Sequence, residues 1–313
     1  MSNSIRVFSP ATIANFGSGF DLLGLAVYGP GDEVEIVPNN ENKLIVKSIT
    51  GDEGRLPYDV TKNTCTVAMQ SFLTALNSTQ GFDVYIDKKM PFGSGLGSSA
   101  ASASAGVFAL NEYFESPFSK IELIKFALDG EFIASKGYHA DNIAPCLLGG
   151  ITFVNDGVNN SIQNINYPND LHITVAYQDI EILTAQAREI LPQTYARATI
   201  IAQQAAFGSL LIGLTNSNYD LIATGLTDLL AVPFRKSLIE NYDELESIAI
   251  ENNAIGFSIS GSGPTLFCVS DGLKTADKIS REWQTFLSNK RRKYLCFTTK
   301  VNKEGTIRIK SER

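Results

Sequence analysis

The pattern of apolar and polar residues divides the first half of the chain into short strands, a glycine-rich turn and helices. Residues 82–87 alternate apolar and polar side chains, as a half-buried strand does, and residues 34–37 and 44–46 are short β-like runs. Residues 99–110 have the length of a helix, begin with serines and contain small residues that favour close packing against a sheet. A capping-box pattern at Ser119 predicts the start of a further helix.

The second half of the chain predicts strands and helices in a specific order. A Gly/Asn-rich hairpin at residues 149–167 is a plausible region between two domains, and residues 171–177 form a strand-like run. A long helical stretch follows over about residues 194–250, and two β runs around a glycine turn come next. A helix at about residues 275–288 and a strand at about residues 294–300 complete the chain. The order β-α-β-β-α-β is typical of a ferredoxin-like arrangement.

Composition limits the class of protein and the way it can hold a ligand. The 313 residues are 44% hydrophobic and suffice for two packed domains, and we find no run near the roughly 18 apolar residues of a membrane span. The N-terminus lacks the form of a signal peptide, so we expect a cytoplasmic protein. The net charge of −7 argues against nucleic-acid and acidic-membrane binding. A polyanionic ligand therefore has to be held by a local device, that is, by donor groups at one site and not by the overall charge of the protein.

The cysteines and histidines do not predict a zinc site. The four cysteines form no C-x-x-C pair, and we expect them to be reduced packing residues. The chain has two histidines, which are too few for a His/Cys zinc site in this context. A participating metal is expected to be Mg²⁺, which would arrive with a nucleotide and take oxygen ligands.

A glycine-rich loop at residues 91–101 is the strongest candidate for that local device. It reads Pro-Phe-Gly-Ser-Gly-Leu-Gly-Ser-Ser-Ala-Ala and lies between a predicted strand and a predicted helix. Glycines allow the backbone to approach an anion closely, and a helix N-terminus offers unpaired N–H donors with a partial positive charge. A Walker A loop would need a lysine after Gly97, and a Rossmann fingerprint would place its third glycine one position later. The alternative to an anion-binding loop is a flexible Gly/Ser turn that binds no ligand.

A second glycine turn stands far along the chain, at residues 258–265, which read Ser-Ile-Ser-Gly-Ser-Gly-Pro-Thr. By itself it predicts an ordinary hairpin turn. Paired with the first loop it becomes more informative, because the two belong to one set of motifs.

Three motifs together resemble the GHMP kinases. They are residues 10–24 (Pro-Ala-Thr-Ile-Ala-Asn-Phe-Gly-Ser-Gly-Phe-Asp-Leu-Leu-Gly), the glycine loop, and the Gly-Ser-Gly-Pro turn at residues 261–264. Within that superfamily the first motif is similar to the homoserine kinase family, and so are residues 137–145, 184–192 and 232–235. Galactokinase and mevalonate kinase carry a Pro-Gly-rich opening followed by Gly-Glu-His, which is absent here.

The resemblance implies both a fold and a reaction. The fold is α+β, with a ribosomal protein S5 domain 2-like ATP-binding domain (residues 1–160) and a ferredoxin-like domain (residues 161–313). The reaction is transfer of the γ-phosphate of ATP to the side-chain hydroxyl of L-homoserine, with Mg²⁺. The alternatives are a GHMP kinase for another small alcohol, such as a mevalonate-type kinase, and a non-catalytic nucleotide-binding sensor. The family resemblance is also compatible with a homodimer and with inhibition by threonine, which shares the amino and carboxyl groups.

The resemblance also assigns residues to amino-acid binding. Arg188 and Arg235 match the substrate arginines of the family, and guanidinium groups can hold a carboxylate bidentately, although each could be a surface arginine. Asp21 is expected to accept the ammonium group with Asn15 beside it, unless Asp21 only caps a turn. Thr184 is expected at the carboxylate, although a helix N-cap would look the same in the sequence.

The resemblance assigns three residues to metal binding and catalysis. Glu131 matches the acidic Mg²⁺ ligand of the family, with Ser99 as its partner. Asn142 occupies the place of a catalytic aspartate in mevalonate kinase-like members, and an amide cannot act as a general base. We therefore expect Asn142 to orient the hydroxyl, with catalysis by positioning and charge stabilisation. Asp141 is expected to point elsewhere, and His139 to orient other groups or to be structural.

The remaining assignments concern ATP. Asn63 is expected near the adenosine end, and the turn residues Gly261, Ser262 and Gly263 are expected to support the phosphate loop. The residues expected to bind the phosphates are Pro91, Phe92, Gly93, Ser94, Gly95, Leu96, Gly97, Ser98, Ser99, Ala100 and Ala101.

Overall fold

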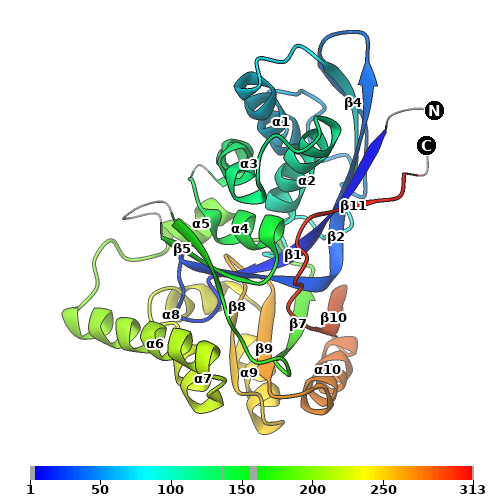
Figure 1. The fold of residues 1–313 in the computed structure, drawn as a ribbon. Coiled ribbons are helices and arrows are strands. Elements are labelled where there is room, and N and C mark those ends of the chain that lie inside the picture. The colour runs from blue at the N-terminus through cyan, green and yellow to red at the C-terminus, as the bar shows by residue number, and fades with distance from the viewer. Residues whose placement is uncertain (1–3, 136, 156–160, 312–313) are drawn as a thin grey trace.

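The structure, a computed structural model, describes residues 4–135, 137–155 and 161–311. Figure 1 shows two layered parts, one above the other, joined through the centre of the molecule. The upper part contains a seven-stranded sheet and the lower part a four-stranded sheet. Both sheets carry helices, so the α+β fold class expected from the sequence is confirmed.

The first sheet is built around one long strand. Strand β2 (Leu23–Asn39) pairs with β1 (Ile5–Ala14) along its length, with β4 (Gly81–Asp87) at one end and with β5 (Ile151–Asn155) at the other. The path continues from β4 to β3 (Leu44–Thr50), from β5 to β6 (Ser161–Ile165), and from β1 to β11 (Ile307–Ile309).

Alternation along β2 gives the first sheet two different faces. Val34 and Ile36 are fully buried in the core beneath the helices, while Glu33 and Glu35 project to the other face. The predicted strands at residues 34–37 and 44–46 are thus parts of β2 and β3.

Four helices cover the apolar face of this sheet: α1 (Thr64–Ala75), α2 (Ser98–Tyr113), α3 (Lys120–Ser135) and α4 (Ala140–Leu148). Helix α2 is the central one, and its residues 100–111 are buried. Small side chains permit this, since a Cβ added at Gly106 would lie 2.7 Å from the Cys65 Sγ of α1. The capping box at Ser119 forms, with the Ser119 N–H donating to Glu122 over 2.8 Å.

The second sheet has the strand order β10-β7-β9-β8, all antiparallel. Its strands are β7 (His172–Gln178), β8 (Gly256–Ile259), β9 (Leu266–Ser270) and β10 (Tyr294–Thr299). In chain order this is 4-1-3-2 with helices after the first and third strands, which is the ferredoxin-like arrangement expected from the sequence.

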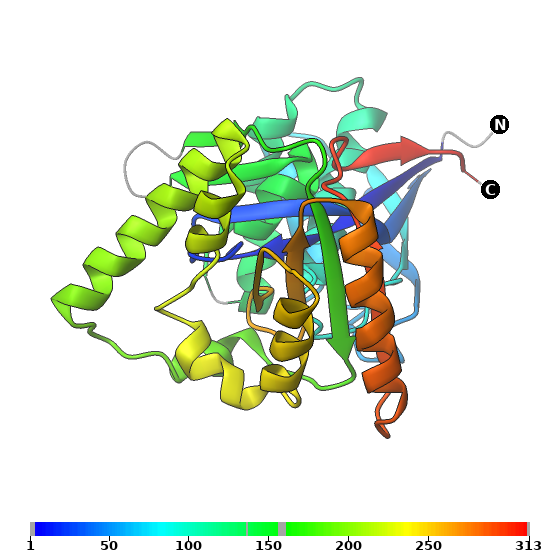
Figure 2. The ribbon, with the colours of Figure 1, turned by 90° about the horizontal axis from the view of Figure 1, so that it is seen from below.

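Helices surround the second sheet on two sides (Figure 2). Between β7 and β8 the chain forms α5 (Thr184–Glu189), α6 (Arg197–Asn216), α7 (Tyr219–Gly225), α8 (Val232–Arg235), a short 3-10 turn η1 (Lys236–Leu238) and α9 (Tyr242–Glu251). Helix α10 (Leu273–Ser288) follows β9 and buries Trp283, whose indole N–H donates to the Leu245 carbonyl over 2.9 Å.

A shared core joins the two parts. Ile13, Phe16 and Leu25 of the first part pack in one apolar cluster with Val175 and Phe267 of the second. The domain boundary at residue 160 stays a prediction. The structure adds that β6 and β11, on the C-terminal side of that boundary, both pair within the first sheet.

Candidate active site

The glycine loop connects β4 to the N-terminus of α2, as its sequence context predicts. Gly93, Gly95 and Gly97 have φ angles of 63°, 75° and 71°, in the left-handed region that glycine adopts without steric strain. Gly97 is the N-cap of α2 and provides no side chain to cap the helix. The first N–H groups of α2 are therefore oriented toward the loop, where they can bind an anion.

The second glycine turn supports this loop from the other domain. The Ser260 hydroxyl donates to the Gly95 carbonyl over 2.6 Å, and the Thr265 hydroxyl donates to the Ser94 carbonyl over 2.6 Å. A Cβ at Gly95 would lie 2.7 Å from the carbonyl oxygens of Gly263 and Ser260. The side-chain hydrogen bonds thus come from residues that flank the trio 261–263, which sequence reasoning did not single out.

A buried ion pair lies beneath the start of α2. The Lys88 ammonium contacts the Asp32 carboxylate and donates to the Ser98 carbonyl and the Ser102 hydroxyl, each over 2.7 Å. Asp32 also accepts the Ser98 hydroxyl over 3.0 Å. The Asp32 side chain is fully buried and that of Lys88 is 5% exposed. Sequence analysis missed both residues, although Lys88 stands three positions before the glycine loop.

The two predicted metal ligands are in direct contact. The Ser99 hydroxyl in the first turn of α2 donates to the Glu131 carboxylate of α3 over 2.7 Å. Burial raises the pKa of Glu131 to about 7, while the Ser99 hydrogen bond opposes that rise. A desolvated carboxylate with a hydroxyl beside it fits Mg²⁺, which prefers oxygen ligands and would offset the burial of the charge.

Asn142 lies between the first motif and the glycine loop. Its Oδ1 accepts the Thr12 hydroxyl over 2.7 Å and would lie 2.8 Å from a Cβ at Gly97. The backbone N–H of Thr12 in turn donates to the Leu96 carbonyl over 3.0 Å. Because Thr12 occupies Oδ1, the amide presents Nδ2 as the group that can donate to a substrate oxygen.

Asp141, which we expected to point elsewhere, belongs electrostatically to the site. Burial and the charge of Asp21 raise its pKa to about 7, with Arg188 acting in the opposite direction. The charges of those groups therefore act on the carboxyl, while the direction in which its side chain points stays a prediction. Residues adjacent on a helix project in different directions, so Asn142 and Asp141 do not occupy one position.

The predicted amino-acid residues converge on Asp21. Arg188 donates to both oxygens of Asp21, over 3.1 and 2.6 Å, and His139 Nδ1 lies 3.8 Å from Asp21 Oδ2. The Asp21 N–H donates to Asn15 Oδ1 over 3.0 Å, and Asn15 Nδ2 donates to the Gly261 carbonyl. Asn15 and Asp21 have φ angles of 63° and 59°, which are uncommon for side-chain-bearing residues and are concentrated at functional sites.

The second arginine lies beside the first, across an aromatic ring. The guanidinium carbons of Arg188 and Arg235 lie 5.7 and 5.4 Å from the Phe20 ring centroid. Arg235 donates to the carbonyls of Ala187 and Gly261 over 3.0 and 2.8 Å. Burial and the charge of Arg188 lower the pKa of Arg235, so a carboxylate near both guanidinium groups would be electrostatically favoured.

Two predicted residues have structural contacts of their own. Asn63 is the N-cap of α1: its side chain is buried, accepts the Cys65 N–H over 3.0 Å and donates to the Pro57 carbonyl. Its contact with adenosine stays a prediction. Thr184 is the first residue of α5 after the N-cap Leu183, so it is not the capping residue that the sequence allowed.

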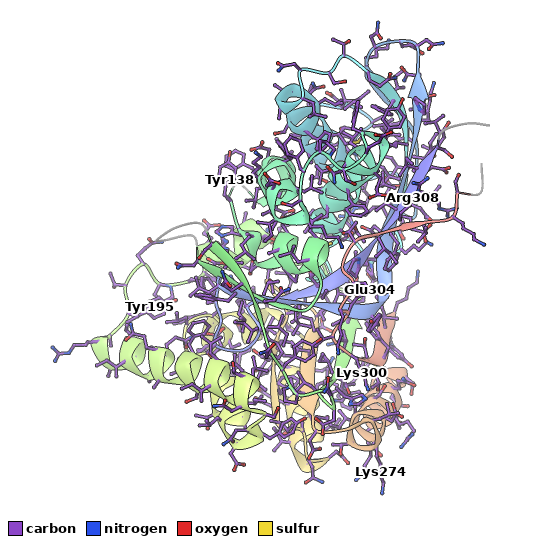
Figure 3. All side chains as sticks on the ribbon, in the orientation of Figure 1. Tyr138, Tyr195, Lys274, Lys300, Glu304 and Arg308 are labelled. Atoms are coloured by element: carbon purple, nitrogen blue, oxygen red, sulfur yellow. The ribbon has the colours of Figure 1, made fainter. Side chains whose placement is uncertain are left out.

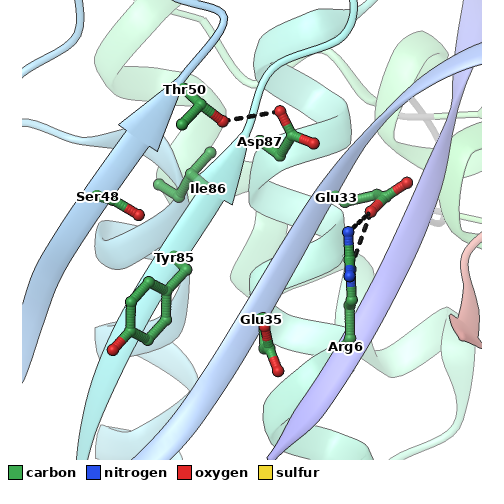
Figure 4. Close-up of a pocket in the computed structure, with 8 residues that line it drawn as sticks. All are labelled: Arg6, Glu33, Glu35, Ser48, Thr50, Tyr85, Ile86 and Asp87. Carbon is green, nitrogen blue, oxygen red and sulfur yellow. Dashed lines mark hydrogen bonds and ion pairs between the residues drawn. The ribbon is translucent and has the colours of Figure 1, made fainter. Parts of the chain in front are cut away.

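A large surface hollow lies away from these residues. It has a volume of about 370 Å³ and occupies the outer face of the first sheet, where Arg6 donates to Glu33 and Thr50 to Asp87 (Figure 4). These two pairs join β1 to β2 and β3 to β4. We therefore assign the site from the converging motifs and not from this hollow.

Comparison with known proteins agrees with the geometry. Two family models match, GHMP kinases N terminal domain over residues 63–150 and GHMP kinases C terminal over residues 210–289. A homoserine kinase from Chlorobaculum tepidum is 38% identical over 292 residues, which are 90% of this chain and 90% of that protein. The chain belongs to the homoserine kinases of the GHMP kinase family. The resemblance deduced from the sequence is therefore confirmed.

Solved GHMP kinases have the same fold as this homoserine kinase family member. A crystal structure of homoserine kinase from Cytophaga hutchinsonii is 39% identical, covers 99% of this chain and 98% of that one, and has a TM-score of 0.96. A mevalonate kinase from L. major, at 15% identity and a TM-score of 0.73, shares the fold alone.

Proposed function

We propose that the protein transfers the γ-phosphate of ATP to the side-chain hydroxyl of L-homoserine and forms O-phospho-L-homoserine for threonine biosynthesis. The observation that carries this proposal is the cluster of Asp21, Arg188 and Arg235, which the start of α4 joins to the glycine loop: His139 at its N-cap lies 3.8 Å from Asp21, and Asn142 in its first turn lies against Gly97. This arrangement is complementary to a zwitterion with a hydroxyl directed at a bound triphosphate.

The ion pair between Arg188 and Asp21 explains how an amino acid would be held. A zwitterion offers one ammonium and one carboxylate, so it can replace this single ion pair by two. The ammonium binds Asp21, and the carboxylate binds Arg188 together with Arg235, with Thr184 beside them. Mevalonate has no ammonium group, so its binding would leave Asp21 without a cationic partner from the substrate.

In the reaction, the chain's own groups act by positioning and by charge. Asn142 Nδ2 donates to the homoserine hydroxyl and aligns it, since Thr12 holds the other end of the amide. The N–H groups at the start of α2 and the backbone of the glycine loop hold the phosphates and stabilise the charge that develops on them. His139 orients Asp21. The hydroxyl oxygen attacks the γ-phosphorus directly while the bond to the β,γ-bridging oxygen breaks and ADP leaves. The hydroxyl proton passes to a phosphate oxygen or to water, and not to a protein general base.

Ser99 and Glu131 would hold Mg²⁺, which neutralises phosphate charge when it is bound. The Glu131 carboxylate is buried and already within hydrogen-bond distance of Ser99, so two oxygen ligands are positioned by α2 and α3. Removal of the metal with a chelator is expected to abolish transfer while the fold is retained, which circular dichroism can check.

We also propose that L-threonine inhibits by competing for the amino-acid position, because it presents the same ammonium and carboxylate. The expected kinetic pattern is competitive against homoserine. A cytoplasmic location is proposed from the reaction, because its substrates are ATP and a free amino acid.

The decisive experiment measures phosphate transfer from ATP to a panel of small alcohols that includes L-homoserine, L-threonine and mevalonate. Transfer to homoserine with at least tenfold higher kcat/KM than to the others supports the proposal. Preference for mevalonate would establish the mevalonate-type alternative, and ATP binding without turnover on any alcohol would establish the sensor alternative.

The absence of a general base has its own test, because Asp141 has a pKa of about 7 and adjoins Asn142 in the chain. The Asp141→Asn variant is expected to keep most of kcat at pH 8, while Asn142→Ala loses about 100-fold. If Asp141→Asn instead removes an inflection in kcat near pH 7 together with most of the activity, Asp141 is the base. Full turnover in Asn142→Ala would exclude the orienting role.

A further inference from the structure

Three segments that are far apart in the sequence meet at the start of the glycine loop. Arg55, in the segment between β3 and α1, has its guanidinium carbon 4.1 Å from the Phe92 ring centroid. The same guanidinium group donates to the Glu181 carboxylate over 2.6 Å. Glu181 follows β7 in the second part, so this ion pair joins the two parts of the molecule beside the glycine loop. We call the contact of Arg55, Phe92 and Glu181 the bridge.

One end of the bridge is fixed to the base of the glycine loop. Asp52 is buried, and its carboxylate accepts two backbone N–H groups of the turn that carries Arg55, over 3.1 and 2.9 Å. A Cβ added at Gly51 would lie 1.9 Å from the Lys88 carbonyl oxygen, so this turn packs against the end of β4. The position of Arg55 is therefore tied to the strand end from which the glycine loop begins.

The other end of the bridge leads to the residues assigned to the amino acid. Glu181 stands three positions before Thr184, with which α5 begins, and seven positions before Arg188. Between them, the Ile182 side chain is buried in the core of the second part. A Cβ added at Gly93 would lie 3.2 Å from Glu181 Cγ, so the glycine loop and this segment are neighbours. Helix α5 itself lies where the two parts meet (Figure 1).

The seam between the two parts is open beside the bridge. A hollow of about 310 Å³ lies there, and the residues that line it come from both parts, among them Gly51, Glu53, Pro91, Tyr177 and Asp179. The Arg55 and Glu181 side chains are 37% and 42% exposed, so their ion pair contributes little to global stability. An exposed pair across an open seam can form or break with the state of the glycine loop, whereas a close-packed core resists such a change.

We propose that Arg55 and Glu181 are positioning residues that couple the binding of ATP to the binding of the amino acid. Filling of the phosphate site orders the glycine loop with Phe92, and the bridge then holds the start of α5 where Thr184 and Arg188 can bind the amino acid. By linkage, homoserine raises the affinity for ATP by the same factor as ATP raises the affinity for homoserine. This inference rests on the proposed function, which supplies the two ligands.

The first test measures this coupling by calorimetry on the full-length protein, with Mg²⁺ and the non-hydrolysable ATP analogue AMP-PNP. In the wild type, saturating homoserine is expected to lower the dissociation constant of AMP-PNP by at least about fivefold. In Arg55→Gln and in Glu181→Gln this ratio is expected to fall below about twofold, because the path between the two sites is cut.

A matched control and a conservative variant separate coupling from a general effect on the fold. Arg308→Gln removes an exposed arginine that pairs with Glu112 within the first part, at the edge of its sheet (Figure 3), and is expected to keep the wild-type ratio. Arg55→Lys keeps a cation over Phe92 and one donor for Glu181, and is expected to retain a ratio of at least about threefold. Melting curves confirm that each variant is folded.

The outcomes distinguish this inference from the proposed function. The coupling role is overturned if the wild type binds both ligands without coupling, or if both glutamine variants keep the wild-type ratio. It is also overturned if these variants weaken AMP-PNP binding equally with and without homoserine, because that result indicates a merely structural role. A wild-type protein that does not bind homoserine at all would refute the proposed function, and this inference with it.

Discussion

Replacing Lys88 by methionine should reveal how strongly the phosphate loop depends on the ion pair beneath it. The substitution removes the ammonium but keeps most of the side-chain volume. Asp32, fully buried, then loses its cationic partner and retains the Ser98 hydroxyl and the backbone N–H groups of Lys89 and Met90. An unpaired buried charge destabilises a protein by about 3–5 kcal/mol.

For a chain of this length, that loss corresponds to a fall in melting temperature of roughly 5–8 °C. The Michaelis constant for ATP should also rise, because Lys88 donates to the Ser98 carbonyl and to Ser102 inside the first turns of α2. The Michaelis constant for homoserine should change much less. Urea denaturation and steady-state kinetics on the same samples measure both effects.

The control and the double variant make this prediction refutable. Lys236→Met removes one partner of an exposed pair, whose Lys236 and Asp243 side chains are 45% and 76% exposed, and should cost less than about 1 kcal/mol. Adding Asp32→Asn to Lys88→Met should recover a large part of the stability, with a coupling energy of about 2–3 kcal/mol. If Lys88→Met is as stable as the wild type, or if Asp32→Asn brings no recovery, the reasoning is wrong.

Three further outcomes are expected. Gly97→Ala places a Cβ 2.0 Å from the Thr12 hydroxyl and should reduce kcat/KM for both substrates by at least 100-fold. Gly54→Ala is the control, because Gly54 has a similar φ of 74° and open space around it. It should cost only about 1 kcal/mol of stability and leave activity unchanged. Arg235→Lys should raise the Michaelis constant for homoserine by about 10- to 100-fold without affecting that for ATP, because lysine cannot replace a bidentate guanidinium; equal effects on both constants would contradict this role. Burial raises the pKa of Asp141 from 3.8 to about 7, so the folded protein binds the extra proton, and stability is lost as the pH rises from about 4 through 7. Asp141→Asn should therefore be more stable than the wild type at pH 8, by at most about 4 kcal/mol, and similar to it at pH 4, as urea denaturation at the two pH values would show.

Sequence reasoning succeeded where local pattern and local chemistry agree. The alternation at residues 82–87 predicted β4, which has one buried and one partly exposed face. Short apolar runs separated by turns and helices predicted the second sheet, in which β7, β8 and β9 are buried throughout. The long strands β1 and β2 were not predicted in full, since they are buried on stretches of both faces and show little alternation.

At the site, the motifs identified the residues whose chemistry is evident from their type. Arg188 and Asp21 are in contact, and Asn142 lies against Thr12 and Gly97, although their roles toward a substrate stay predictions. Lys88 and Asp32 were missed because their importance lies in a contact between residues 56 positions apart, which no local pattern records. The side-chain support from Ser260 and Thr265 was missed for the same reason, since it joins two domains.

The pairing of β11 with β1 has a consequence for the order of synthesis. Ile307–Ile309 pair with Phe8–Arg6, so β1 leaves the ribosome long before its partner strand β11. At about 5–20 residues per second, the roughly 300 residues between them take about 15–60 s to make. During that interval the outer edge of β1 has unpaired N–H and C=O groups and can pair with another nascent chain. Newly made protein should therefore be most vulnerable to aggregation through β1, and a chain that ends before residue 307 should remain so permanently.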